Sequence, residues 1–258
     1  MTSLKVIEYR KEFLKCLNSI EYGKSRYKVF QDFIEVSTIS IFNTIAKNEE
    51  LEKRYFEIIG QYKNPNKLAE LLAITAAALE KVPCDFLGDV YMFGEFGNRN
   101  TGQVFTPYHV AEMMSLCTYD KDNLKREIEE KGFITVSEPC CGAGVMLIAF
   151  AHTLLNYGFN PQQVMWFELR DIDINCCYMA YIQTSLLGLS GQVQHGNTIT
   201  METWQNFTTP FSVFTYHKFK SFRQKSEEQK QIIDTKIQKE ERKQEYENIK
   251  IEQLSLFS

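Results

Sequence analysis

The chain has 258 residues, of which 44% are hydrophobic and 24% are charged, and its formal net charge at neutral pH is -4. This length is enough for one sizeable core, alone or with a smaller helical domain, and the composition is that of an ordinary globular protein. The small negative charge excludes a chain that is basic throughout, but it leaves room for a local basic face that binds nucleic acid.

The first 82 residues have a helical pattern. Phe30, Phe33 and Ile34 begin an apolar stripe at helix spacing, and the segment LAELLAITAAALEKV at residues 68–82 is rich in strong helix formers. Pro83 follows that segment directly and is expected to end the helix. We therefore predict that the N-terminal part of the chain is helical.

From about residue 104 to 200 the pattern alternates between strands and helices. Residues 133–136 and 164–167 are predicted to be short strands, and residues 145–158 and 174–187 are predicted to be helices. Strand–helix–strand–helix alternation is typical of a parallel sheet in an α/β domain.

These patterns predict three parts of the chain. A helical N-terminal domain covers residues 1–100, an α/β domain covers residues 101–216, and a charged tail covers residues 217–258. The tail is dense in Lys, Glu and Gln, which predicts either a solvated helix or a flexible tether.

No membrane span or export signal is expected. No apolar run reaches the roughly 18–20 residues that a bilayer requires, and the start, MTSLKVIEYRKEF, has no apolar signal region. We therefore expect a cytoplasmic protein whose seven cysteines remain thiols.

Adjacent Cys140 and Cys141, in the stretch VSEPCCGAGVM, allow three interpretations. A zinc site usually needs pairs with Cys-x2-Cys spacing, which Cys140 and Cys141 do not provide with the pair Cys176 and Cys177. A disulfide between neighbouring cysteines is strained. We favour the third interpretation, small hydrophobic packing residues, and we expect no metal site.

The glycines that follow indicate a ligand site. Gly142 and Gly144 lie where the predicted strand meets the next helix, so backbone amides and a helix N-terminus can approach a ligand. Asp171 follows the next strand, where α/β cofactor folds place a carboxylate that accepts from ribose hydroxyls. The alternatives are an ordinary tight turn for the glycines and a helix-capping role for the acid. Together, however, the glycine loop and Asp171 have the spacing of a nucleoside-binding unit.

Three segments resemble the N6-adenine DNA methylase family, especially modification subunits of type I restriction systems. TGQVFTP at residues 101–107 resembles the family's Gly-Gln-Phe-Phe-Thr-Pro motif, and EPCCGAG at residues 138–144 resembles its Asp-Pro-x-Cys-Gly-x-Gly loop. DFLGDVY at residues 85–91 resembles the helix that leads into the domain. The resemblance covers roughly residues 65–200. It implies a Rossmann-like S-adenosylmethionine-dependent methyltransferase domain with a parallel-rich sheet, acting in site-specific adenine-N6 methylation of DNA.

The resemblance also implies which residues bind S-adenosylmethionine. Phe105 and its neighbours would border the methionine end, the glycine loop would face the cofactor, and Asp171 would hold the ribose. Asn197 stands where the family has an acid that contacts the adenine amino group, and it keeps only a carbonyl acceptor. The full implied set is Phe105, Thr106, Pro107, Glu138, Pro139, Gly142, Gly144, Asp171 and Asn197.

The expected catalytic motif is altered. The family's Asn/Asp-Pro-Pro-Tyr/Phe accepts both hydrogens of the adenine amine and stacks an aromatic ring on the flipped base. No two prolines are adjacent here, and the candidate is Thr209-Pro210-Phe211, with an ordinary turn as the alternative. Two further hypotheses follow: a catalytically weak or inactive subunit that binds DNA or a sliding clamp, and an interaction protein whose cofactor loop is vestigial.

The last residues resemble a partner-binding peptide. QLSLF at residues 253–257 is similar to the pentapeptide with which many bacterial DNA enzymes dock on the replication sliding clamp. Leu256 and Phe257 would fill an apolar pocket, Leu254 a neighbouring one, and Gln253 would bond at its rim; packing on the chain's own domain is the alternative. DNA and a separate recognition or catalytic subunit are the other expected partners.

Overall fold

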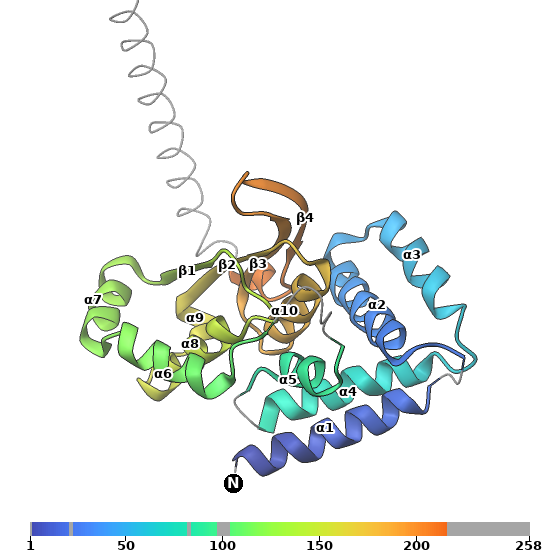
Figure 1. Cartoon of the computed structure of the whole chain (residues 1–258). Coiled ribbons are helices and arrows are strands. Elements are labelled where there is room, and N and C mark those ends of the chain that lie inside the picture. Colours follow the sequence, from blue (N-terminus) through green and yellow to red (C-terminus); the bar gives the residue numbers. More distant parts are fainter. Residues whose placement is uncertain (1, 21–22, 82–83, 97–103, 216–258) are drawn as a thin grey trace, which may run out of the picture. The chain divides into compact units, whose positions relative to one another are not determined.

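The computed structural model describes residues 2–20, 23–81, 84–96 and 104–215. Residues up to Phe214 form one compact unit (Figure 1). The tail, with Gln253, Leu254, Leu256 and Phe257, lies outside the described residues.

The N-terminal part is helical, as predicted. Side chains that precede the helices satisfy their first amides: Ser25 accepts from the Lys28 N–H, and Asn48 accepts from the Leu51 N–H. Phe13, Phe30 and Phe33 are fully buried and meet edge to face or tilted. The helices are α1 (Thr2–Asn18), α2 (Arg26–Ala46), α3 (Glu49–Ile59), α4 (Asn66–Lys81) and α5 (Phe86–Phe93).

The second part of the unit is an α/β sheet structure. β1, β2 and β3 are parallel neighbours in that order, and β4 pairs with β3 in the antiparallel direction. The predicted class, an α/β fold with a parallel-rich sheet, is therefore confirmed. The elements are α6 (Tyr108–Thr118), α7 (Lys121–Lys131), β1 (Ile134–Glu138), α8 (Val145–Asn156), α9 (Pro161–Val164), β2 (Met165–Asp171), α10 (Ile174–Leu186), β3 (Ser190–Asn197) and β4 (Glu202–Thr208).

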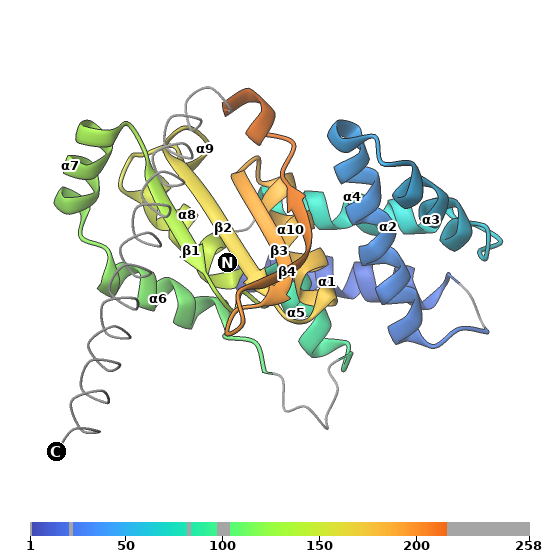
Figure 2. The ribbon, with the colours of Figure 1, turned by 90° about the horizontal axis from the view of Figure 1, so that it is seen from above.

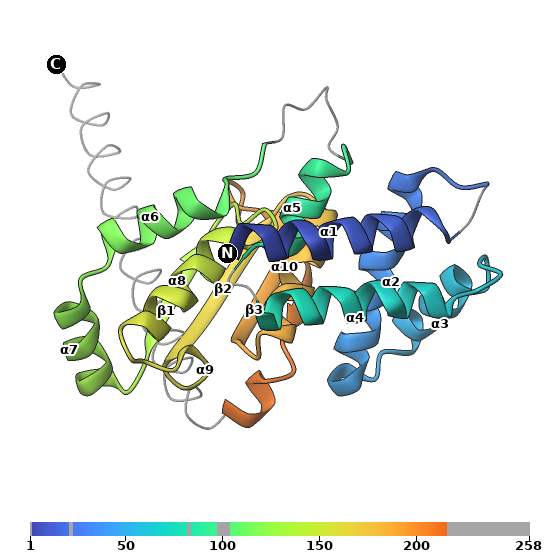
Figure 3. The same cartoon turned by 90° about the horizontal axis from the view of Figure 1, so that it is seen from below.

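The helices α8 and α10 lie on one face of the sheet, which Figures 2 and 3 show from opposite sides. Alternate residues of β2, Phe167 and Leu169 among them, point into the core between this face and the two helices. The other side of α10, with Met179 and Ile182, packs against the N-terminal helices. The boundary predicted near residue 100 therefore runs through a compact unit, and the division into domains stays a prediction.

Helices of the described residues include none that is both long and apolar enough to cross a membrane.

Candidate functional site

Three of the predicted cofactor residues end neighbouring parallel strands. Glu138 is the last residue of β1, Asp171 of β2 and Asn197 of β3. Because the strands are parallel, these ends lie at one edge of the sheet, which we call the carboxyl edge. Open α/β sheets bind ligands at this edge.

The loop between β1 and α8 is held in a conformation that requires glycine. Gly142 has a φ of +53° and Gly144 a φ of +95°, in the left-handed region that other residues rarely adopt. The Cys141 N–H donates to the Arg170 carbonyl at 2.9 Å, which ties the loop to β2. No side chain caps α8 at Gly144, so the first-turn amides are suited to an acceptor group of a ligand.

Asp171 fastens this loop to the next strand. Its Oδ2 accepts from the Gly142 N–H at 2.8 Å, and its Oδ1 accepts from the Asp173 N–H at 2.9 Å. The side chain is only half-buried, and each carboxylate oxygen can accept more than one hydrogen bond. Asp171 therefore shapes the loop and still has acceptor capacity for hydroxyl groups of a ligand.

Asn197 serves the turn that follows β3. Its Oδ1 accepts from the Ile199 N–H at 2.9 Å and from the Thr200 N–H at 3.3 Å. The Thr198 hydroxyl donates to the Pro139 carbonyl and so joins this turn to the glycine loop. These bonds use the Asn197 acceptor within the protein, and its contact with a cofactor stays a prediction.

An aromatic pair lies over the glycine loop. A Cβ added to Gly142 would be 3.6 Å from the ring of Phe105, which stacks on Tyr91 with centroids 5.2 Å apart and planes at 23°. Burial raises the pKa of Tyr91, and Tyr27 and Asp173 nearby raise it further, so the phenol is neutral at pH 7.

Sequence reasoning did not single out Tyr91, although it closes the DFLGDVY segment. Thr106 and Pro107 are exposed, and Pro107 directly precedes α6. Of the predicted 105–107 segment, Phe105 is therefore the residue shown to approach the loop.

The two neighbouring cysteines differ in environment. Cys141 is buried with β2 and α10, and burial raises its pKa well above the ordinary value, so it is an unreactive thiol. Cys140 is exposed. The packing interpretation therefore holds for Cys141 alone. Among the residues described by the structure, no group of three or more His, Cys, Asp or Glu side chains is arranged to hold a metal ion.

The candidate catalytic triplet lies at the other end of β3. The Thr209 N–H donates to the Gly191 carbonyl at 3.0 Å, and the Thr209 hydroxyl donates to the Leu189 carbonyl at 2.7 Å. Gly191 and Asn197 are separated by six residues of extended chain, or about 20 Å. The structure therefore does not bring Thr209, Pro210 and Phe211 to the carboxyl edge, and the arrangement fits the alternative interpretation of an ordinary turn.

We expect Thr209→Val to lower the free energy of unfolding by about 1–3 kcal/mol, because it removes a buried hydroxyl that also accepts from the Gly191 N–H at 3.1 Å. Binding at the carboxyl edge should be unchanged. Urea unfolding and ligand titration measure the two effects. A stable variant with impaired activity at the carboxyl edge would contradict this placement.

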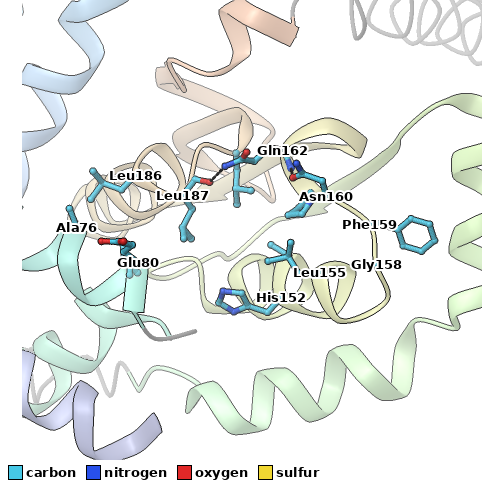
Figure 4. Close-up of a pocket in the computed structure, with 14 residues that line it drawn as sticks. Ala76, Glu80, His152, Leu155, Gly158, Phe159, Asn160, Gln162, Leu186 and Leu187 are labelled. Carbon is cyan, nitrogen blue, oxygen red and sulfur yellow. Dashed lines mark hydrogen bonds between the residues drawn. The ribbon is translucent and has the colours of Figure 1, made fainter.

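A groove of about 750 Å³ is present at the opposite edge of the sheet (Figure 4). Its walls include Gln162 and Leu187, which precede β2 and β3, and His152 of α8. The His152 Nδ1 is 2.7 Å from the Tyr108 hydroxyl, and burial lowers the pKa of His152 to about 4, so the imidazole is neutral at pH 7. Of the predicted site residues that the structure describes, none lines this groove.

Comparison with known proteins matches the chain to a family and to solved structures. Residues 83–250, more than half of the chain, match the family described as N-6 DNA Methylase. The crystal structure of a type I restriction-modification system methyltransferase subunit from Streptococcus thermophilus is similar, with a TM-score of 0.39 and 14% identity. The match covers 80% of this chain and 60% of that one, so the chain spans less than two thirds of that subunit. No curated protein matches the sequence.

Proposed function

The chain belongs to the N-6 DNA methylase family, and from that premise we propose that it binds S-adenosylmethionine at the carboxyl edge and acts in the N6 methylation of adenine in DNA. The observation that supports this most is the glycine loop, whose Gly142 N–H is bonded to Asp171 at 2.8 Å beneath the ring of Phe105. Loop, acid and aromatic ring come from three separate segments of the chain.

Each of these groups suits one portion of the cofactor. The uncapped first turn of α8 attracts an anion and suits the methionine carboxylate. The remaining acceptor capacity of Asp171 suits ribose hydroxyls. Phe105, stacked on Tyr91, offers an apolar wall that excludes water from one side of the loop.

When bound, S-adenosylmethionine supplies a methyl group activated by its sulfonium centre. The contribution of the protein is then to hold donor and acceptor in line, and positioning of this kind supplies a large part of the rate. An adenine amine is a poor nucleophile, so a methylase also needs acceptors for its two hydrogens. Thr209 is committed to a turn at the other edge, so we assign this role to no residue of the described chain.

A second candidate function follows from that observation: a subunit that binds the cofactor or DNA while another subunit holds the target base. Among the described residues, β1 pairs with β2 alone. The side of β1 that faces away from β2 is therefore open to pairing with a further strand. A parallel strand added there would end beside Glu138, at the carboxyl edge. DNA binding and docking of residues 253–257 on a sliding clamp are proposed for either function.

Calorimetric titration with S-adenosylmethionine and transfer of labelled methyl groups to DNA separate the two candidates. Binding with transfer to adenine N6 supports the methylase, and binding without transfer supports the subunit. No binding of S-adenosylmethionine overturns the methylase and every subunit role that needs the cofactor, and leaves only a subunit that binds DNA.

The clamp proposal is tested with a synthetic peptide of residues 250–258. Binding to a bacterial sliding clamp, with displacement by a known clamp peptide, is expected. Binding that the known peptide does not displace, or no binding, would contradict it.

A further inference from the structure

Two buried polar side chains meet beneath the glycine loop. Gln183 of α10 donates from Nε2 to the Ala143 carbonyl at 2.9 Å and to Asp85 Oδ1 at 2.7 Å. Asp85 precedes α5, 98 positions away in the sequence. We propose that Gln183 and Asp85 are positioning residues for the cofactor loop: Gln183 holds the Ala143 peptide, and Asp85 fixes the direction of the Gln183 amide. The assignment of a cofactor to this loop rests on the proposed function.

The network determines the orientation of the Gln183 amide. Its Oε1 accepts from the Leu87 N–H at 3.0 Å, while both Nε2 hydrogens have acceptors. A flipped amide would turn Oε1 toward the Ala143 carbonyl and the Asp85 carboxylate, and would turn the NH2 group toward the Leu87 N–H. Gln183 is fully buried, so water cannot relieve these mismatches, and one orientation is selected.

The Ala143 peptide is the part of the loop that most needs such a constraint. It lies between two left-handed glycines, which can adopt many backbone conformations. Its carbonyl accepts from Gln183, and its other end, the Gly144 N–H, donates to the Cys141 carbonyl at 2.8 Å. With both ends bonded, the peptide cannot rotate, and the direction in which α8 begins is fixed.

The position of the Asp85 side chain is fixed by its contacts with Gly88. A Cβ on Gly88 would lie 2.0 Å from Asp85 Oδ2, so glycine is required, and the Gly88 N–H donates to Asp85 Oδ1 at 2.9 Å. The pKa of Asp85 is raised to about 6, by burial first and by the Asp89 charge as well, against the lowering effect of the hydrogen bonds from Gln183 and Gly88.

The other groups near Asp85 contribute no free positive charge. Asp89 is paired with Arg10 at 2.9 Å. Cys84 is buried, and burial raises its pKa to about 12, so it is neutral at pH 7. With a pKa of about 6, Asp85 is mostly a carboxylate at that pH, which is the stronger acceptor for the Gln183 amide.

Gln183→Met tests the assignment, because it keeps the length of the side chain and removes both donors. We expect at least tenfold weaker binding of S-adenosylmethionine, and faster amide hydrogen exchange at residues 142–146 in the ligand-free protein. The matched control is Gln162→Met, which removes the bond from Gln162 Nε2 to the Leu187 carbonyl at 3.0 Å at the opposite edge (Figure 4). It should change binding by less than twofold.

The polarity of the network gives a signature that simple packing does not produce. Gln183→Glu places a carboxylate against Asp85 and the Ala143 carbonyl, so binding should be weakest at pH 8. At pH 5.5, below the pKa of about 6 of Asp85, the pair of facing carboxyl groups holds a proton and can again form a hydrogen bond. Affinity relative to the wild type should then recover at least fivefold. Asp85→Asn keeps an Oδ1 acceptor and should bind within threefold of the wild type, whereas Asp85→Ala should lose about tenfold.

These outcomes separate the inference from the proposed function. If the wild type does not bind S-adenosylmethionine, the proposed function fails, and the exchange of residues 142–146 still tests the positioning. Unchanged exchange in a folded Gln183→Met would overturn the inference. Asp85→Ala provides the same exchange test should Gln183→Met not fold, and unchanged exchange there would overturn it as well.

Discussion

Gly142→Leu is expected to weaken the binding of S-adenosylmethionine by more than about 100-fold, or roughly 2.7 kcal/mol. A side chain at this position would start 3.6 Å from the Phe105 ring and fill the space between loop and aromatic wall. It would also strain a residue whose φ is +53° and disturb the bond from its N–H to Asp171. Calorimetric titration of the purified variant measures the loss.

A matched glycine separates site filling from backbone strain. Gly158 has a φ of +88°, and a Cβ there meets nothing within 4 Å. Gly158→Leu should therefore carry a similar conformational cost, about 1–2 kcal/mol, and bind the cofactor as the wild type does. Less than tenfold loss in a folded Gly142→Leu would show that the cofactor does not occupy this loop.

The glycine loop between β1 and α8 could be predicted from sequence because its determinants are local. A β-rich run, two glycines and an apolar helix follow one another from Ile134 to Asn156, and the acid comes directly after the next strand. Parallel strands bring their carboxyl ends together whatever the rest of the chain does. The contact between Gly142 and Asp171 is the observed result.

The position of Thr209 could not be predicted in this way. After β3 the chain can either cross the sheet and add its next strand beside β1, or turn back and pair with β3. Which of the two occurs depends on pairing between strands. Here it doubles back: the turn after Asn197 includes Met201 at a φ of +60°, and Gly196 allows the close approach of the Glu202 backbone. The sequence of this hairpin contains no Asn-Gly or Asp-Gly pair, which are the pairs that most strongly predict a hairpin turn.

The hydrogen bond between Asp85 and Gln183 could not be predicted from sequence for a related reason. Helix periodicity shows which face of a helix is buried, but it does not show what covers that face. The N-terminal helices pack against α10 in one continuous core, and this packing brings Asp85 within 2.7 Å of a residue 98 positions later. A division into a helical and an α/β domain at residue 100 would separate these partners.

Asp171→Ala is expected to weaken the binding of S-adenosylmethionine by about 30–100-fold, or roughly 2–2.7 kcal/mol. The change removes the acceptor of the Gly142 N–H at 2.8 Å, so the loop keeps the bond from Cys141 to Arg170 but loses a second tie to β2, together with the acceptor assigned to the ribose. The Asp173 N–H loses its acceptor as well, and the free energy of unfolding should fall by about 1–3 kcal/mol. Titration and urea unfolding must therefore be measured on the same preparation.

Asp120→Ala distinguishes loss of the site from loss of stability. Asp120 also accepts from a backbone N–H, that of Asn123 at 3.0 Å, but it caps α7 rather than the glycine loop. Its removal should cost about 1 kcal/mol of stability and leave cofactor binding unchanged. Equal affinity of the Asp120 and Asp171 variants would mean that the carboxylate at the end of β2 does not hold the ribose. The ribose would then have to be held by other groups at the carboxyl edge.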